Sequence, residues 1–288
     1  MQKPKIILIT LIFLSGIFGW AGMSWAVESI CPGGSNPDPN VIFCDDFEGG
    51  DLSKWTYAVP RAEIVSIPSP VYSGNNSLHI PYDIPAGPPE HQDNNRFVQV
   101  DMSSYNLDHF FVRGYFYLAY TDKPTAARKL YYIWCNPQTD PKWDIVVSAN
   151  GGISSTPLSL SFCSNYYPSY SDLSWPQWDI AKGKIFYDTW YLIEVEVKLN
   201  SVPGIKDGEV RLWLNDNLEY EKTSISIRND SKNLGIVRIG AQIDRDGDEL
   251  ERHEDRYWDD IAISKRYIDP LSESNATPPS APTGVQVE

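Results

Sequence analysis

The sequence predicts an all-β protein, built as a sandwich of two antiparallel sheets. From residue 41 onward, short apolar or alternating runs recur between turn signals, which is the pattern of a β-sandwich. Amphipathic stretches of helical period are absent from the sequence. Tyrosine and tryptophan number 17 and 10, more than the core of a sandwich needs. These observations together indicate antiparallel β-structure.

The predicted strands follow one another in the order of the chain. Each is a run of apolar or alternating residues bounded by Gly, Pro, Asn, Asp or Ser. The predicted strands are Val41–Phe43, Ser77–Tyr82, Arg96–Asp101, Phe110–Tyr120, Lys129–Cys135, Trp143–Ser148, Leu158–Cys163, Trp190–Lys198, Glu209–Leu214, Gly235–Asp244 and Trp258–Ser264.

The first 26 residues have the pattern of a cleavable secretory signal peptide. Lys3 and Lys5 give a positive start, residues 6–20 are apolar, and Ser24 and Ala26 are small residues at positions −3 and −1. The apolar run is shorter than the ~20 residues of a spanning helix, so we expect cleavage and no membrane insertion of the mature chain. The expected location is therefore secreted, periplasmic or at the cell surface.

The rest of the chain divides into one domain and a tail. Residues 27–270 are expected to form a single domain, because β-sandwiches of this length are common. Residues 271–288 are a Pro/Ser/Thr-rich linker, whose end resembles the opening strand of a fibronectin type III module.

Charge and cysteine content restrict the partners and the compartment. The formal net charge of −14 disfavours nucleic acid and anionic membranes as partners. A polyanionic substrate would need a locally basic groove. The four cysteines suit an oxidising compartment, and of three possible pairings we favour Cys31–Cys44 and Cys135–Cys163, because each pair flanks a turn-rich connection.

Three stretches carry a resemblance to a known family. They are residues 43–55 (FCDDFEGGDLSKW), residues 190–215, which begin WYLIEVEVKLN and end LWLN, and residues 257–264 (YWDDIAIS). In order and spacing they resemble the concanavalin A-like jelly rolls of laminin-G-like lectins and polysaccharide lyases. The resemblance implies a jelly-roll sandwich over most of residues 41–269, whereas activity varies among proteins on this scaffold.

The chain also departs from the catalytic motifs of this group. The Glu-x-Asp-x-x-Glu strand of jelly-roll β-glucanases is absent, and the alternation around Glu194 and Glu196 places both on an outer, solvated strand face. The full Arg-x-Glu-x-Arg, Gln-Ile-His and Tyr-x-Lys-x-Gly set of alginate-lyase-like jelly rolls is absent too. Arg96 and Gln242 match parts of it.

The resemblance also implies a structural calcium ion that links the first strand to the last. In related jelly rolls an acidic side chain and backbone carbonyls hold this ion. The expected ligands here are Asp45, Asp46 or Glu48 from the first strand, with Asp259 or Asp260 from the last. We favour Asp45, Glu48 and Asp260.

Strand alternation assigns side chains to the face away from the core. In the strand 110–120, residues 112, 114, 116 and 118 make an apolar inner face, so the residues between them point outward. In the same way, Arg238 and Gln242 point outward, and either Tyr131 or Tyr132 does so. The expected catalytic residues are Arg113, Tyr115 and Gln242, and the expected substrate-binding residues are Phe111, Tyr117, Arg96, Tyr131 and Arg238.

These residues suit two functions. A lyase that cleaves an acidic glycan by β-elimination would use Arg113 and Gln242 to neutralise the uronate carboxylate, with Tyr115, Tyr131 or a histidine moving protons. A non-catalytic carbohydrate-binding or adhesion module would use the same aromatic and cationic side chains only to hold the sugar. A structural surface domain, with Arg113 in an ordinary surface ion pair, is a third alternative. A polysaccharide is the expected partner.

Overall fold

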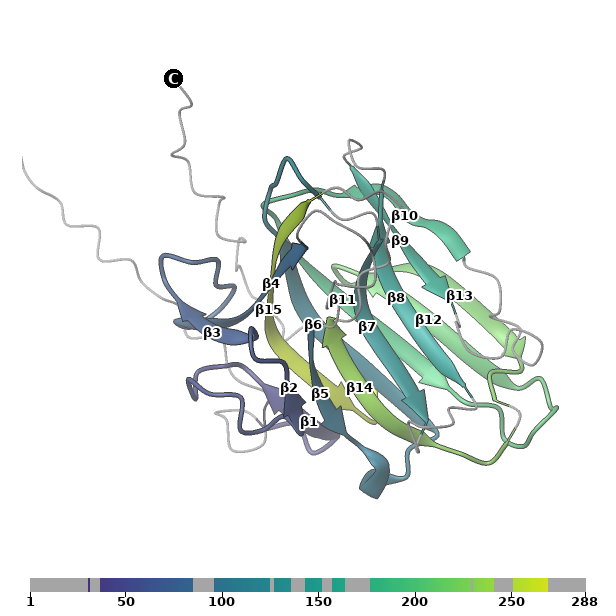
Figure 1. Ribbon diagram of the computed structural model, residues 1–288. Coiled ribbons are helices and arrows are strands. Elements are labelled where there is room, and N and C mark those ends of the chain that lie inside the picture. Colours follow the sequence, from purple (N-terminus) through teal and green to yellow (C-terminus); the bar gives the residue numbers. More distant parts are fainter. Residues whose placement is uncertain are drawn as a thin grey trace, which may run out of the picture.

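Two antiparallel sheets pack face to face in the computed structural model of the chain (Figure 1). The structure describes residues 31, 37–84, 96–124, 127–135, 143–151, 157–163, 177–228, 230–240 and 251–268. The expected signal peptide, the linker 271–288 and the predicted site residue Gln242 lie outside these ranges. Within them, the antiparallel sandwich predicted from the sequence is confirmed.

Sheet A is the eight-stranded sheet, counted over the described residues. Its hydrogen-bonded order is β13-β12-β11-β6-β15-β4-β3, and β1 pairs with β15. Along this order the strands are β13 (Asn217–Ile225), β12 (Gly208–Leu214), β11 (Trp190–Lys198), β6 (His109–Leu118), β15 (Arg252–Ser264), β4 (Asn76–Ile84), β3 (Glu63–Ser66) and β1 (Val41–Asp45).

Sheet B has seven strands by the same count. Its order is β10-β9-β8-β7-β14-β5-β2. These strands are β10 (Gln177–Ile185), β9 (Leu158–Cys163), β8 (Asp144–Asn150), β7 (Ala127–Cys135), β14 (Leu234–Gly240), β5 (Phe97–Asp101) and β2 (Tyr57–Ala58). The described helical structure is a short 3-10 turn at Ser103–Tyr105, and no helix in the described ranges is long and apolar enough to span a bilayer.

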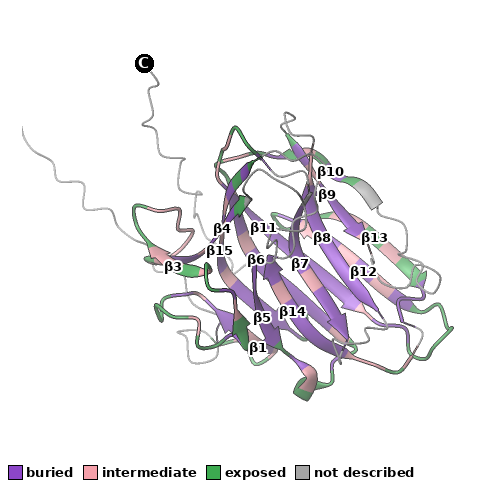
Figure 2. Cartoon of the chain, viewed as in Figure 1, coloured by how far each residue is buried: buried purple, intermediate pink, exposed green. Residues whose placement is uncertain are grey.

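The core lies between the sheets, where alternate residues of the long strands meet. Most of the length of the central strands is coloured as buried in Figure 2. In β11, for example, Ile193, Val195 and Val197 face the core of the sandwich. Every strand predicted from the sequence is present. Four strands, β2, β3, β10 and β13, are not predicted from the sequence, because β2 is two residues long and the others carry mixed polar sequences without a clean apolar alternation.

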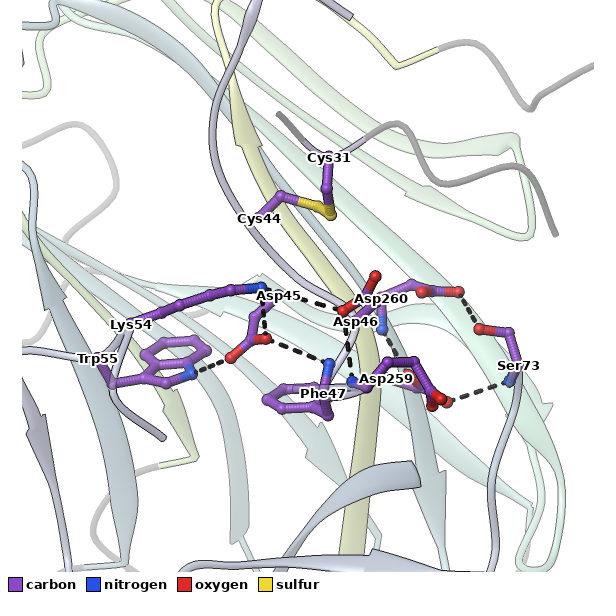
Figure 3. The surroundings of a disulfide bond; sticks show 11 residues. Cys31, Cys44, Asp45, Asp46, Phe47, Lys54, Trp55, Ser73, Asp259 and Asp260 are labelled. Carbon is purple, nitrogen blue, oxygen red and sulfur yellow. Dashed lines mark hydrogen bonds and ion pairs between the residues drawn. A yellow bond between two sulfur atoms is a disulfide. The ribbon is translucent and has the colours of Figure 1, made fainter. Parts of the chain in front are cut away.

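One of the two predicted disulfides is present. Cys31 is bonded to Cys44, which lies on β1 (Figure 3). The predicted Cys135–Cys163 bond is wrong, since the structure does not join these two residues. Cys135 points into the core from β7, whereas Cys163 ends β9, and β8 separates the two strands. Sequence spacing suggested that a turn could bring them together, but the three-strand meander holds them apart.

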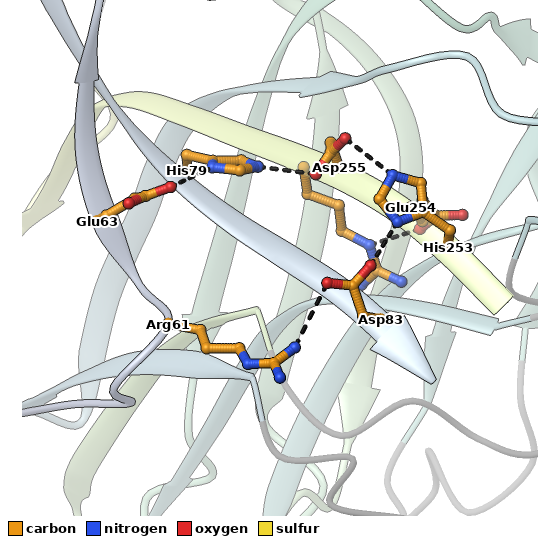
Figure 4. A network of polar contacts seen from close by, with 8 residues as sticks. Arg61, Glu63, His79, Asp83, His253, Glu254 and Asp255 are labelled. Atoms are coloured by element: carbon orange, nitrogen blue, oxygen red, sulfur yellow. Dashed lines mark hydrogen bonds and ion pairs between the residues drawn. The ribbon is translucent and has the colours of Figure 1, made fainter. Parts of the chain in front are cut away.

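Two histidines connect β3, β4 and β15 on the outer face of sheet A (Figure 4). His79 contacts Glu63 through Nδ1 at 3.0 Å and Asp255 through Nε2 at 2.8 Å. His253 contacts Asp83 through Nδ1, and its Nε2 lies 3.3 Å from Asp255. Both rings therefore lie between two carboxylates, which favours the doubly protonated imidazolium.

This histidine pair is expected to make stability depend on pH. Burial alone would lower the pKa of His79, but the hydrogen bonds to Asp255 and Glu63 outweigh it and raise that pKa. The hydrogen bond to Asp83 is the main cause that raises the pKa of His253. A raised histidine pKa gives stability that is full below the ordinary value of 6.5 and is lost as pH rises through the raised value.

The measurement is the free energy of urea unfolding of wild type and His79→Gln at about pH 5.5 and about pH 8. The free energy of unfolding of the wild type should exceed that of the variant by a larger amount at the lower pH. The extra difference should be ~1.4 kcal/mol for each unit by which the pKa of His79 is raised. An equal difference at both pH values would contradict this role for His79.

Candidate functional site

The outer face of sheet B carries an ordered row of polar and aromatic side chains. The strands β5, β14 and β7 lie side by side, and Arg238 on β14 pairs with Gln99 on one side and with Tyr132 on the other. Their chain neighbours Val98, Ile239 and Ile133 belong to the core, so all three side chains point away from it. The candidate site is this sheet B face, which consists of Phe97, Gln99, Lys129, Tyr132, Trp134 and Arg238.

Three contacts with other described residues hold Arg238 on this face. Its Nε donates to Oε1 of Gln99 at 2.7 Å. Its guanidinium carbon lies 3.9 Å from the ring centroid of Phe97 and 4.2 Å from that of Trp134. A guanidinium fixed between two rings is already oriented for a carboxylate, which it recognises through parallel hydrogen bonds.

A phenol and a second cation lie beside Arg238. The Tyr132 ring meets Trp134 edge to face, with centroids 4.6 Å apart, and Nζ of Lys129 is 6.0 Å from the Tyr132 centroid. Lys129 pairs across the sheet with Ser148, which pairs with Ser161 on the next strand. The face thus combines two cations, an amide and a phenol, the groups needed to bind a carboxylate and to move a proton.

The structure divides the residues predicted for one groove between two faces. Arg113, Tyr115, Phe111 and Tyr117 do point outward from β6, as the alternation predicts, but β6 belongs to sheet A. Arg238 belongs to sheet B, so it points away from the opposite side of the sandwich. Arg113 and Arg238 therefore cannot act on the same sugar ring, and the prediction of a shared face is wrong.

Arg113 is a buried structural residue rather than a free cation. It is 7% exposed, donates to the carbonyl of Ile268 and lies 3.8 Å from Glu194. Glu194 in turn accepts a hydrogen bond from the Ile268 amide at 3.1 Å. The segment after β15 thus covers this part of sheet A. Glu194 and Glu196 are buried as well, so the predicted solvated strand face is also wrong.

Tyr131 is not on the sheet B face, whereas a substrate-binding role for Arg96 stays a prediction. Tyr131 lies in the core, where its hydroxyl donates to the carbonyls of Ile193 at 3.0 Å and Gly114 at 3.3 Å, and burial raises its pKa. Arg96 is buried just before β5, and its carbonyl accepts the hydroxyl of Tyr82 at 2.8 Å. Of the two tyrosines left open by the sequence, Tyr132 is the one that faces outward.

The expected metal ligands have different surroundings (Figure 3). Asp45 accepts hydrogen bonds from Trp55 Nε1 at 2.8 Å and Lys54 Nζ at 3.0 Å, so hydrogen-bond donors engage both of its oxygens. Asp260 accepts from the Ser73 hydroxyl at 3.0 Å, and its pKa is raised to about 6 by burial and then by the charge on Asp46. Among the described residues, no group of three or more His, Cys, Asp or Glu side chains is arranged to hold a metal ion.

Glu48 lies against the turn that precedes β4. Its Oε1 accepts the backbone amides of Asn75 and Asn76, each at 2.8 Å. Gly74 has a φ of +63°, which favours glycine, and a Cβ added there would lie 2.5 Å from Oε1 of Glu48, so the carboxylate would have to shift. The turn after β1 and the turn before β4 are therefore joined through a carboxylate.

The comparisons with known proteins identify the fold. No protein family and no curated protein matches this chain. Among solved structures, the chain is similar to an endo-β-1,4-glucuronan lyase from the fungus Trichoderma reesei, with 14% identity, a TM-score of 0.54, and coverage of 78% of this chain and 96% of the other. It is also similar to the alginate lyase vAL-1 from Chlorella virus, with 13% identity, a TM-score of 0.57, and coverage of 79% and 100%.

A third similar structure is the alginate lyase Aly36B, with 12% identity, a TM-score of 0.50, and coverage of 73% of this chain and 85% of the other. At these identities the likeness concerns the course of the chain and not individual side chains. The resemblance inferred from the three sequence stretches is confirmed at that level. The chain has the jelly-roll sandwich fold that these polysaccharide lyases share.

Proposed function

We propose that this protein cleaves an acidic polysaccharide by β-elimination on the sheet B face. The observation that carries the proposal is the row Gln99–Arg238–Tyr132, which places an oriented guanidinium next to an amide and a phenol. The fold supports it, because two solved structures of the same fold are lyases named for polyuronates, glucuronan and alginate. Among the described residues, this face carries two cations, the partly exposed Arg238 and the buried Lys129, against one buried carboxylate, Asp144, in a chain of net charge −14.

The proposed chemistry assigns one task to each side chain. Arg238, oriented by Gln99, binds the uronate carboxylate and stabilises the negative charge that develops when the C5 proton leaves. Tyr132 moves the proton: its phenolate takes the C5 proton, the C4–oxygen bond breaks, a C4=C5 double bond forms, and the resulting phenol gives the proton to the leaving oxygen. Lys129, near the Tyr132 ring, stabilises negative charge on the phenol oxygen during this transfer.

A screen of purified protein against polysaccharides tests the proposal. Glucuronan, alginate and pectate would be compared with neutral glycans, with ultraviolet absorbance used to detect unsaturated products and gel retention to detect binding. Absorbance with a polyuronate is the expected result. Retention by a polyuronate without any product would instead assign a non-catalytic carbohydrate-binding module, and the absence of both would reject an acidic glycan as ligand.

The proposal places the protein outside the cytoplasm. The signal-like pattern of residues 1–26 and the Cys31–Cys44 disulfide both suit an oxidising compartment. A secreted, periplasmic or cell-surface protein would meet a polysaccharide substrate there.

Calcium is proposed as a structural ion beside the turn before β4. Asp260 fits this role, because its carboxylate lies against Ser73 of that turn. Hydrogen-bond donors engage both oxygens of Asp45 and both oxygens of Glu48, so either of these residues would give up hydrogen bonds to bind the ion. Carbonyl oxygens of the backbone would complete the ligand set of such an ion.

Chelation is expected to lower the melting temperature, and added calcium should restore it, because an ion that binds only the folded state stabilises it by mass action. At about 100 times its Kd such an ion contributes ~2.7 kcal/mol. Asp260→Ala should abolish the response, whereas Asp122→Ala, in an exposed loop, should keep it. Identical melting curves with and without chelator would exclude structural calcium.

A further inference from the structure

A continuous chain of aromatic rings crosses the outer face of sheet A, on the side of the sandwich opposite the sheet B face. Neighbouring rings in this chain have centroids 3.4 to 5.9 Å apart. In order across the sheet, this aromatic belt consists of His79, Tyr257, Tyr117, Trp190, Tyr72 and Tyr115.

The belt is not part of the hydrophobic core. On β4, β15 and β6 the core residues are the chain neighbours Ile80, Trp258 and Phe116, so the belt rings point the other way. All six rings retain contact with solvent, and five of them are only half-buried. The rings come from the four adjacent strands β11, β6, β15 and β4 and from the loop before β4. They therefore form one continuous surface rather than scattered exposed residues.

Carboxylates border the belt at one end and beside Tyr117. Asp188 accepts the hydroxyl of Tyr117 at 3.2 Å. At the His79 end, Glu63 and Asp255 both contact the imidazole, so this end keeps a net negative charge even when His79 is protonated. The neighbouring guanidinium on β6, that of Arg113, is already bonded to the Ile268 carbonyl.

We propose that the aromatic belt is a second carbohydrate-binding site, which takes a neutral polysaccharide. Aromatic rings present apolar faces to the C–H faces of pyranose rings, while carboxylates accept hydrogen bonds from sugar hydroxyls. The same carboxylates repel a polyuronate, so the charge of this face selects against the substrate class proposed for sheet B. The two faces would bind two glycans of different charge, and binding at the belt does not depend on catalysis at sheet B.

Affinity electrophoresis through gels that contain glucomannan, β-glucan or xylan tests the belt. Wild type should be retarded by at least one of these neutral glycans, and Trp190→Ala should weaken that binding by about 3- to 10-fold. Tyr105→Ala removes an exposed aromatic side chain outside the belt and should bind like wild type. Melting curves would establish that each variant is folded.

Three results would overturn the proposal: no retardation of wild type by any neutral glycan, equal binding by wild type and folded Trp190→Ala, or Trp190-dependent retardation by alginate alone. The test is separate from that of the proposed function, because Tyr132→Phe should lose product formation and keep its retardation on the neutral gel. Loss of retardation in Tyr132→Phe would place neutral-glycan binding on the sheet B face instead.

Discussion

Tyr132→Phe is expected to lower the turnover of a polyuronate by about 10²- to 10⁴-fold while leaving the melting temperature unchanged. The substitution removes only the hydroxyl and keeps the ring that meets Trp134 edge to face, so the packing of the sheet B face is retained. Proton transfer through the phenol is lost entirely. Initial rates of absorbance increase at saturating substrate give the size of the effect.

Two further variants make this result specific. Tyr120→Phe removes a hydroxyl from a highly exposed tyrosine outside the sheet B face and should leave turnover unchanged. Arg238→Lys keeps the charge but loses the planar fork that Phe97, Trp134 and Gln99 orient, so both substrate binding and turnover should fall. Full activity of a folded Tyr132→Phe would remove Tyr132 from the mechanism.

The sequence predicts the fold well because its signals are local. Alternating apolar residues mark the long strands, and three short stretches in the right order indicate the jelly roll. Cys31 and Cys44 are 13 residues apart and are joined near the end of β1, so sequence spacing could predict their pairing. Features that depend on residues close together in the sequence can therefore be predicted without a structure.

The site could be predicted only in part, because alternation shows which way a side chain points but not which sheet its strand joins. Arg113 and Arg238 both alternate with core residues, yet their strands lie in different sheets. Arg113 is covered by Ile268, which is 155 positions away in the sequence. No local sequence pattern reveals such a contact. An irregularity of pairing between Lys129 and Tyr131 shifts the phase of β7, so counting from one end could not decide between Tyr131 and Tyr132.

Signals for the missed residues were nonetheless present. Phe97 and Gln99 alternate with Val98 and Val100, the same pattern that assigned the outward residues of β6. Trp134 follows Tyr132 by two residues and thus shares its face. Applied to every strand and combined with the strand order, the alternation would have given the whole sheet B face.

A buried ion triad between the two sheets is a feature that the sequence did not indicate. Glu254 of β15 accepts from Arg128 Nε at 2.7 Å and from Arg256 Nε at 2.6 Å, and all three side chains are 0% exposed. The guanidinium carbon of Arg256 lies 3.7 Å from the Tyr82 ring centroid, and Arg128 also donates to the Tyr187 hydroxyl at 2.9 Å. Burial alone would raise the pKa of Glu254, but the two guanidinium groups outweigh it and hold that pKa below its ordinary value.

Glu254→Ala is therefore expected to reduce the free energy of unfolding by ~3–5 kcal/mol, the largest stability effect that we predict. The loss comes from leaving two guanidinium groups buried without their shared carboxylate, beyond the loss of the carboxylate's own contacts. Urea unfolding at neutral pH measures it, and Glu221→Ala, which removes an exposed partner of Arg211, should cost less than ~1 kcal/mol. If Glu254→Ala does not fold, Glu254→Gln can be measured instead, because it keeps the shape of the side chain and removes only its charge. Its loss of unfolding free energy should be larger than that of Glu221→Ala and smaller than that expected for Glu254→Ala. Equal stability of Glu254→Gln and wild type would mean that the charge of Glu254 does not hold the two arginines in the core.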